Sequence, residues 1–233
     1  MKMRTIALAL AGALATATAT ATFAASFTLF GNASIVSGGN PIKAAQIVSD
    51  GGNATPYGGV DLVATTVTTL STLTFLGTDY QMTAGDCGGG SPRFEIGVPA
   101  GNIFVYLGPA PNYTGCTPGW QSSGNLLLGS VDTSQIGGTF YDTWAHALVL
   151  AGGSTVAYID IVVDAGWAAP PVGPVQTALV DNVRINDEIV TFDPLPPPAN
   201  ANDCKNNGWK NVSGPNGPFK SQGDCIQFVN TGK

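Results

Sequence analysis

Charged residues are scarce in this chain, and histidine is almost absent. Only 10% of the 233 residues are Asp, Glu, Lys or Arg, and the one histidine is His146. Residues 26–198 carry thirteen acidic side chains but only three basic ones, Lys43, Arg93 and Arg184. Nucleic acid and anionic membranes both require a basic protein face. The charge balance therefore argues against nucleic acid as a partner and against an anionic membrane surface.

The motifs of several common enzymes are also missing. The chain has no Gly-x-Ser-x-Gly elbow, and CGGGS at 87–91 lacks the Lys-Ser/Thr ending of a phosphate loop. It has two glutamates, Glu95 and Glu188, and lacks the Glu-x-Asp-x-Glu signature of β-sandwich glucanases. The sequence therefore assigns no catalytic residue. A glycoside hydrolase, which needs two carboxylates across a cleft, is the less favoured alternative, with Asp160 and Asp164 as the acids to consider.

Beyond residue 25, no apolar run is long enough to cross a bilayer as a helix. Residues 1–25 combine a basic start (MKMR), a short apolar run (TIALALAGALA) and a tail of small residues. This pattern is typical of a secretory signal peptide, cleaved near Ala24 or Ala25. We expect the mature protein to be secreted and extracellular, or periplasmic in a Gram-negative host, with no membrane span.

The four cysteines suit an oxidising compartment, and they allow three disulfide pairings. Proximity in the chain favours Cys87–Cys116 and Cys204–Cys225, each stabilising by roughly 3–4 kcal/mol in the loop-entropy model. Zinc is the alternative, but the chain contains no Cys-x-x-Cys pair. We therefore expect disulfides and no cofactor, apart from the calcium alternative considered below.

Glycine, threonine, serine, asparagine and proline are plentiful, and this composition favours strands and turns over helices. The stretch 155–192 predicts two or three strands around a Pro/Gly loop, because residues 158–163 alternate between two faces. RFEIGV at 93–98 alternates in the same way and is followed by a hairpin partner at 101–108. Further strands are expected at 27–36, 43–50, 59–64, 75–82, 125–132 and 139–141, with a short helix or strand at 144–150.

These elements predict an all-β protein, an antiparallel β-sandwich spanning residues 26–192. Residues 193–203 form a Pro-rich linker, which cannot join a central strand. Residues 204–233 are too few to build a core without a disulfide, so we expect a small Cys-bridged tail. Its large apolar residues, Trp209, Phe219 and Phe228, either pack on each other under the bridge or dock on the sandwich.

Asp181 conflicts with the pattern around it, since it falls on the same face as the apolar residues Leu179, Val183 and Ile185. One explanation is a β-bulge, or a carboxylate bonded to nearby backbone amides. The other is a structural calcium site, in which Asp181 is helped by Asp160, Asp164 or Asp187. No Asp-x-Asp-x-Asp-Gly loop supports the calcium site, and the first explanation is favoured.

Two parts of the chain resemble known proteins. The segments LTFLGTDYQM (73–82), SPRFEIGV (91–98) and TALVDNVRIN (177–186) resemble strands of secreted bacterial β-jelly-roll domains, including carbohydrate-binding-module-like ones. The tail pattern Cys204-Lys-Asn-Asn-Gly-Trp209 with Phe219-Lys-x-Gln-Gly-Asp-Cys225 resembles a short two-cysteine element found at the C-terminus of bacterial exported proteins of undefined function. The resemblance implies a jelly-roll-like fold and brings no catalytic residues.

Sugar binding requires aromatic rings in loops or on one sheet face, beside side chains that bond to hydroxyls. Trp120 and Trp167 lie in polar or Gly/Pro-rich loops, and Tyr113 is a further candidate. The competing interpretation is that these rings are buried and close the ends of the sandwich. We expect a non-catalytic protein that binds a polysaccharide or another cell-surface component. The alternative is a structural or cell-surface-associated protein without a small ligand.

Overall fold

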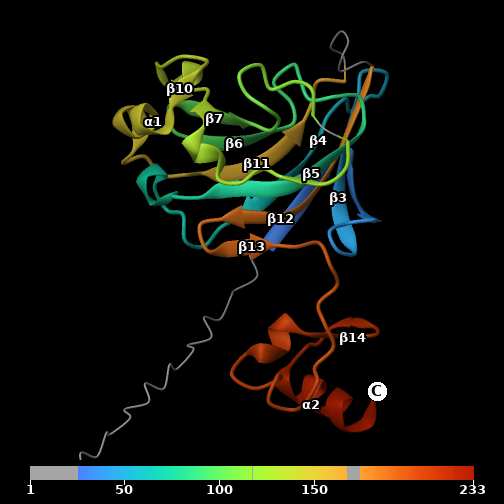
Figure 1. The fold of residues 1–233 in the computed structure, drawn as a ribbon. Helices are drawn as coiled ribbons and strands as arrows, with labels where there is room; N and C mark the ends of the chain where they lie inside the picture. Colours follow the sequence, from blue (N-terminus) through green and yellow to red (C-terminus); the bar gives the residue numbers. More distant parts are fainter. Residues whose placement is uncertain (1–25, 117, 167–173) are drawn as a thin grey trace, which may run out of the picture.

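A computed structural model describes residues 26–116, 118–166 and 174–233. Two antiparallel sheets face each other in the body of the molecule, and a small element follows at the C-terminus (Figure 1). The first sheet, which we call sheet A, contains five strands in spatial order: β1 (Ser26–Gly31), β4 (Gly58–Val63), β11 (Tyr158–Val163), β6 (Arg93–Val98) and β7 (Gly101–Tyr106).

The second sheet, sheet B, packs against the first. Its strands in spatial order are β2 (Ala33–Ser37), β3 (Lys43–Asp50), β12 (Val175–Ile185), β5 (Leu76–Ala84) and β8 (Gln121–Ser122), with β13 (Glu188–Val190) paired to β12. Three of these strands, β3, β12 and β5, lie at its centre, and every described pairing in both sheets is antiparallel.

The strand order is that of a jelly roll. The strands β3, β4, β5, β6, β7, β8, β11 and β12 can be numbered one to eight in chain order. Sheet B then contains the first, eighth, third and sixth strands, in that spatial order. The second, seventh, fourth and fifth form the other sheet, which is the double Greek-key arrangement. Strands β1 and β2 extend one edge of each sheet. The expected all-β, jelly-roll-like sandwich is therefore confirmed.

The core lies between the sheets because each strand alternates between an inward and an outward face. Phe94 and Ile96 on β6 and Ile159 and Ile161 on β11 point inward and are at most 2% exposed. The alternate residues of these strands face outward from sheet A. This second face carries the polar side chains discussed below.

Three local predictions were wrong in detail. The strand expected at 27–36 is two strands, because the chain leaves sheet A at Gly31 (φ +59°) and enters sheet B as β2. Residues 125–132 form a 3₁₀ turn over Leu126–Leu128 and the two-residue β9 (Ser130–Val131). The strand expected at 139–141 is the two-residue β10 (Asp142–Thr143). Of the alternatives left open for 144–150, the helix forms as α1 (Trp144–Ala151).

The pairing of β12 explains the position of Asp181. A register shift between Asp181 and Arg184 places Ala178 and Val180 in the core before the shift, and Val183 and Ile185 after it. Leu179 therefore does not share a face with Val183, as the unbroken alternation predicted. The bulge is local, and it adds one residue to the strand.

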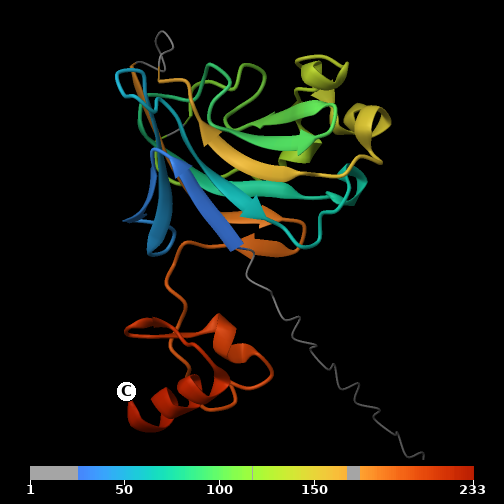
Figure 2. The ribbon, with the colours of Figure 1, turned by 180° about the vertical axis from the view of Figure 1, so that it is seen from behind.

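The C-terminal element has its own small core. Cys204, Cys225 and Val212 are buried, and Trp209 and Phe219 pack against them. Phe219 and Phe228 also pair at 5.4 Å between ring centroids, so the aromatic residues of the tail pack within it. The element contains η4 (Gly208–Asn211), β14 (Ser213–Gly214), β15 (Gly217–Pro218) and α2 (Gln222–Thr231). Figure 2 shows it joined to the sandwich through the proline-rich segment.

Both expected disulfides, Cys87–Cys116 and Cys204–Cys225, are present. Two disulfides indicate an oxidising, extracellular-type environment. None of the helices in the described ranges is long and apolar enough to cross a membrane. The expected signal peptide, residues 1–25, lies outside the described residues.

Candidate functional site

The structure describes two of the three aromatic candidates from the sequence, Trp120 and Tyr113. Trp120 is half-buried in the loop that leads into β8, at the edge of sheet B. Tyr113 packs against Tyr106 and stacks on Tyr141, and its hydroxyl donates to the carbonyl of Ser130 at 3.3 Å. Trp167 lies outside the described residues.

The outer face of sheet A carries an acidic row that sequence reasoning missed. Asp61 on β4 is paired with Asp160 on β11, and Asp160 is paired in turn with Glu95 on β6. Side chains paired across an antiparallel sheet have Cβ atoms roughly 4.5–5.5 Å apart. We call Asp61, Asp160 and Glu95 the acidic row. Three like-charged groups side by side are unfavourable unless protons, cations or ligands compensate them.

The central member of the row holds its proton unusually tightly. Burial raises the pKa of Asp160 to about 7, helped by the charges of Asp61 and Glu95 and by a hydrogen bond with Asp61. One carboxylate oxygen of Asp160, Oδ1, is buried and has no hydrogen-bond partner. A carboxyl group whose pKa is shifted strongly by burial and by charged neighbours is a candidate for a functional site.

The positive charge of Arg93 compensates the negative charge of Glu95, at one end of the acidic row. Its guanidinium donates to Glu95 and, with both terminal nitrogens at 2.7 Å, to Asp164. Burial disfavours the charged form, but these hydrogen bonds and charges outweigh it, so the pKa of Arg93 is raised. The guanidinium also lies 5.0 Å from the ring centroid of Phe104 on β7. Both terminal nitrogens of Arg93 therefore already donate to carboxylates, whereas its Nε is buried and has no hydrogen-bond partner.

Two aromatic rings lie across glycines beside the acidic row. The ring of Tyr158 occupies the space where a Cβ on Gly97 would stand, with ring atoms 2.3–2.7 Å from that position. The ring of Phe30 covers Gly59 in the same way. A side chain at either glycine would displace the ring, so the glycines let the rings lie over the sheet. Tyr158 remains 37% exposed, and its hydroxyl donates to Asn102 Oδ1 at 2.6 Å.

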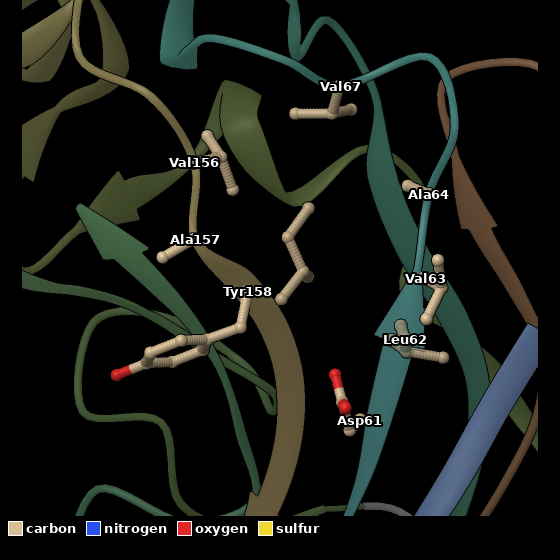
Figure 3. Close-up of a pocket in the computed structure, with 9 residues that line it drawn as sticks. Asp61, Leu62, Val63, Ala64, Val67, Val156, Ala157 and Tyr158 are labelled. Atoms are coloured by element: carbon tan, nitrogen blue, oxygen red, sulfur yellow. The ribbon is translucent and has the colours of Figure 1, made fainter.

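The outer face of sheet A is hollowed in two places. A cavity of about 210 Å³ opens where β4 and β11 part, with Asp61 and Tyr158 in its lining. Figure 3 shows Asp61 on β4 and Tyr158 on the neighbouring strand β11, with the Tyr158 ring extending away from Asp61. A second cavity, of about 460 Å³, lies over β6 and β7 and is lined by Arg93, Phe104 and Tyr106. We call this second one the β7 cavity. Its size lies within the range of small-ligand sites.

Other acidic residues have structural roles. Glu188 accepts hydrogen bonds from the backbone amides of Thr65 and Thr66, at 3.2 and 2.7 Å. Burial opposes its ionisation, but these bonds and those from the threonine side chains outweigh it and lower the pKa of Glu188. The carboxylate therefore fastens the loop that follows β4.

Asp181 likewise accepts backbone amides, from Asn40 and Asn182, each at 2.8 Å. The β-bulge and the hydrogen bonds from backbone amides therefore account for the burial of Asp181, which was the favoured explanation from the sequence. Asp181 belongs to sheet B and Asp160 to sheet A, facing outward, so the two do not share a calcium site. Within the described ranges, one group of three metal-ligating residue types has its ligand atoms within 4.8 Å of one another: Asp86 with Cys87 and Cys116, whose cysteines form a disulfide.

The lone histidine belongs to a separate structural contact. His146 Nδ1 lies 2.7 Å from Asp142 Oδ2, and Asp142 also accepts from the hydroxyl of Thr133. The hydrogen bond from Thr133 is the largest of the effects that lower the pKa of Asp142 to about 2. The contact joins α1 to the β9–β10 region and lies outside the acidic row.

A sequence signal for the acidic row did exist. GGVDLV, RFEIGV and YIDIVV each place one acid near the middle of an apolar strand. Such an acid must point away from the core. What the pattern does not provide is the strand order and register, and only these place the three acids side by side.

Comparisons of the chain with protein-family models, with curated proteins and with solved structures found no match. No relative therefore supplies a role for these residues.

Proposed function

We propose that the protein is a non-catalytic, extracellular glycan-binding protein and that the outer face of sheet A is its binding surface. The observation that carries this proposal is the combination of the acidic row with the ring of Tyr158 across Gly97. A ring lying over a sheet offers an apolar surface to the C–H groups of a sugar. Adjacent carboxyl groups accept hydrogen bonds from its hydroxyls.

The environment supports the same proposal. Two disulfides suit an extracellular protein, and insoluble glycans are abundant targets there. The row lies on a sheet face and not in a deep cleft that would exclude water, which favours binding over catalysis.

A pull-down of the full chain with insoluble cellulose, chitin, xylan and peptidoglycan tests the proposal. We expect one polymer to retain the protein, and we expect Tyr158→Ala to lower retention about tenfold with an unchanged circular-dichroism spectrum. Trp120→Ala is the matched aromatic variant on the other sheet and should bind normally. Loss of retention in Trp120→Ala alone would move the site to the edge of sheet B. Absence of retention on every polymer would refute glycan binding and favour the structural role.

Glycoside hydrolysis is a second candidate that one observation favours. Asp160 is protonated up to about pH 7 beside Asp61, and a protonated acid next to a carboxylate is what such catalysis needs. Release of reducing ends from the retained polymer, abolished in Asp160→Asn, would establish this activity. Retention without any release would leave binding as the function.

A further inference from the structure

The β7 cavity is continuous with the proposed binding face, because its floor belongs to the same sheet. Phe104 on β7 is the direct partner of Glu95, and Tyr106 is the partner of Arg93. Both β7 side chains alternate with the core residues Ile103 and Val105 and so point outward with the acidic row.

One wall of the cavity rises beyond the edge of the sheet. Asp132 forms an isolated β-bridge with Phe104, so the chain at this point continues the sheet past β7. Ser134, Gln135 and Phe140 follow and line the cavity. Phe140 is 60% exposed although it is a large apolar residue. The wall therefore offers an unoccupied aromatic surface to whatever enters the cavity.

Buried hydrogen bonds hold this wall in place. Asp132 is 1% exposed, and it accepts from the Tyr106 hydroxyl at 2.7 Å and from the Ser134 amide at 2.9 Å. Gln135 Oε1 accepts from the backbone amide of Asn102 at 3.1 Å, which joins the wall to the start of β7. A wall that is fixed before binding reduces the entropy cost of holding a ligand.

A second part of the cavity lining belongs to a loop that a disulfide holds. Gly89 and Gly90 line it, in the loop that begins at Cys87 and is bridged to Cys116. Arg93 donates to the carbonyl of Gly90 at 3.0 Å, which attaches this loop to the floor. A ligand lying along the acidic row therefore meets a fixed wall at the β7 side.

We propose that the β7 cavity holds the terminal unit of an uncharged glycan, so that the protein recognises chain ends and not the middle of a chain. This inference rests on the proposed glycan binding and specifies its ligand. Both β1 and β7 are edge strands of sheet A, but the wall that carries Ser134, Gln135 and Phe140 stands across the path of a glycan chain beyond β7. Anionic sugars are excluded because both terminal nitrogens of Arg93 already donate to carboxylates, and because the lining residue Asp132 is a further acid.

Calorimetric titration of the full chain with the hexasaccharide of the retained polymer, and with a much longer soluble fraction of it, tests the inference. Recognition of ends gives one protein per chain for both lengths. A number of bound proteins that grows with chain length would overturn it while leaving glycan binding intact. Absence of binding to any glycan would remove both proposals together.

Two variants locate the site of the terminal unit. Ser134→Trp should fill the cavity and Phe140→Ala should remove its aromatic wall, each lowering the affinity for the hexasaccharide on the order of tenfold. Leu128→Ala, which truncates an 86% exposed residue outside the cavity, should bind normally. Unchanged affinity in both cavity variants, or equal binding of polygalacturonate, would refute the assignment.

Discussion

Replacing Asp160 by asparagine should make the protein more stable at neutral and alkaline pH. The folded protein holds the proton of Asp160 up to about pH 7, whereas the ordinary pKa of an aspartate side chain is 3.8. Between these two pH values the folded state binds more protons than the unfolded state. Its stability therefore falls as pH rises through this range, and it stays lower above pH 7. Asparagine resembles the neutral carboxyl group and does not titrate.

The size of the effect follows from the shift in pKa. A rise in the pKa of Asp160 from 3.8 to about 7 corresponds to about 4 kcal/mol in the free energy of unfolding. Asp160 is only partly buried, and water at the open face screens its neighbours. We therefore expect the free energy of unfolding of Asp160→Asn to exceed that of the unsubstituted protein by about 2–4 kcal/mol at pH 8.

Urea denaturation of both proteins, from pH 4 to pH 8, measures this difference. It should be near zero at pH 4, grow through pH 7 and then stay constant. Asp187→Asn is the matched control, because the side chain of Asp187 is fully exposed and lies outside the acidic row. In an Asp61→Asn background, where one source of the shift is removed, the gain should be smaller. A constant difference over the whole range, or a less stable Asp160→Asn at pH 8, would refute the reasoning.

Three further predictions concern the structural residues. Glu188→Gln should lower the free energy of unfolding by about 1–3 kcal/mol at pH 7, and the difference in urea denaturation should vanish as pH falls below 4.5. The double change Cys204→Ser and Cys225→Ser should unfold the tail, which Trp209 fluorescence measures. The thermal transition of the sandwich should stay unchanged, because the sandwich and the tail have separate cores. Unfolding of the sandwich together with the tail would contradict this. Asp142, with its pKa lowered to about 2, should contribute stability above pH 4 that is lost as pH falls towards 2, and Asp142→Asn should lack that acid-range slope.

The fold was predictable because its information is local. Alternation within single strands, as in RFEIGV, locates most strands to within a few residues. The failures also have local causes: Asn125 accepts from the amide of Leu127 and turns an apolar run into a 3₁₀ turn. At β12 an inserted residue reverses the alternation, and no pattern of period two anticipates that reversal.

The candidate site was not predictable because its information is not local. Asp61, Glu95 and Asp160 are tens of residues apart in the chain, and only the order β4-β11-β6 makes them neighbours. Loop tryptophans such as Trp120 attract attention in a sequence, since a large ring in a polar loop needs no register to be noticed. A tyrosine at the start of a strand, such as Tyr158, gives no such signal until its neighbour Gly97 is known.

The outer face of sheet A carries two features that stability alone does not explain. Glycines such as Gly59 and Gly97, inside strands, weaken a sheet, and carboxyl groups in register repel each other. These are independent costs, one of backbone entropy and one of charge, yet both fall on this face around β11. Natural proteins depart from stabilising rules mainly at functional sites. Their coincidence is therefore an argument for function that does not depend on which ligand the face binds.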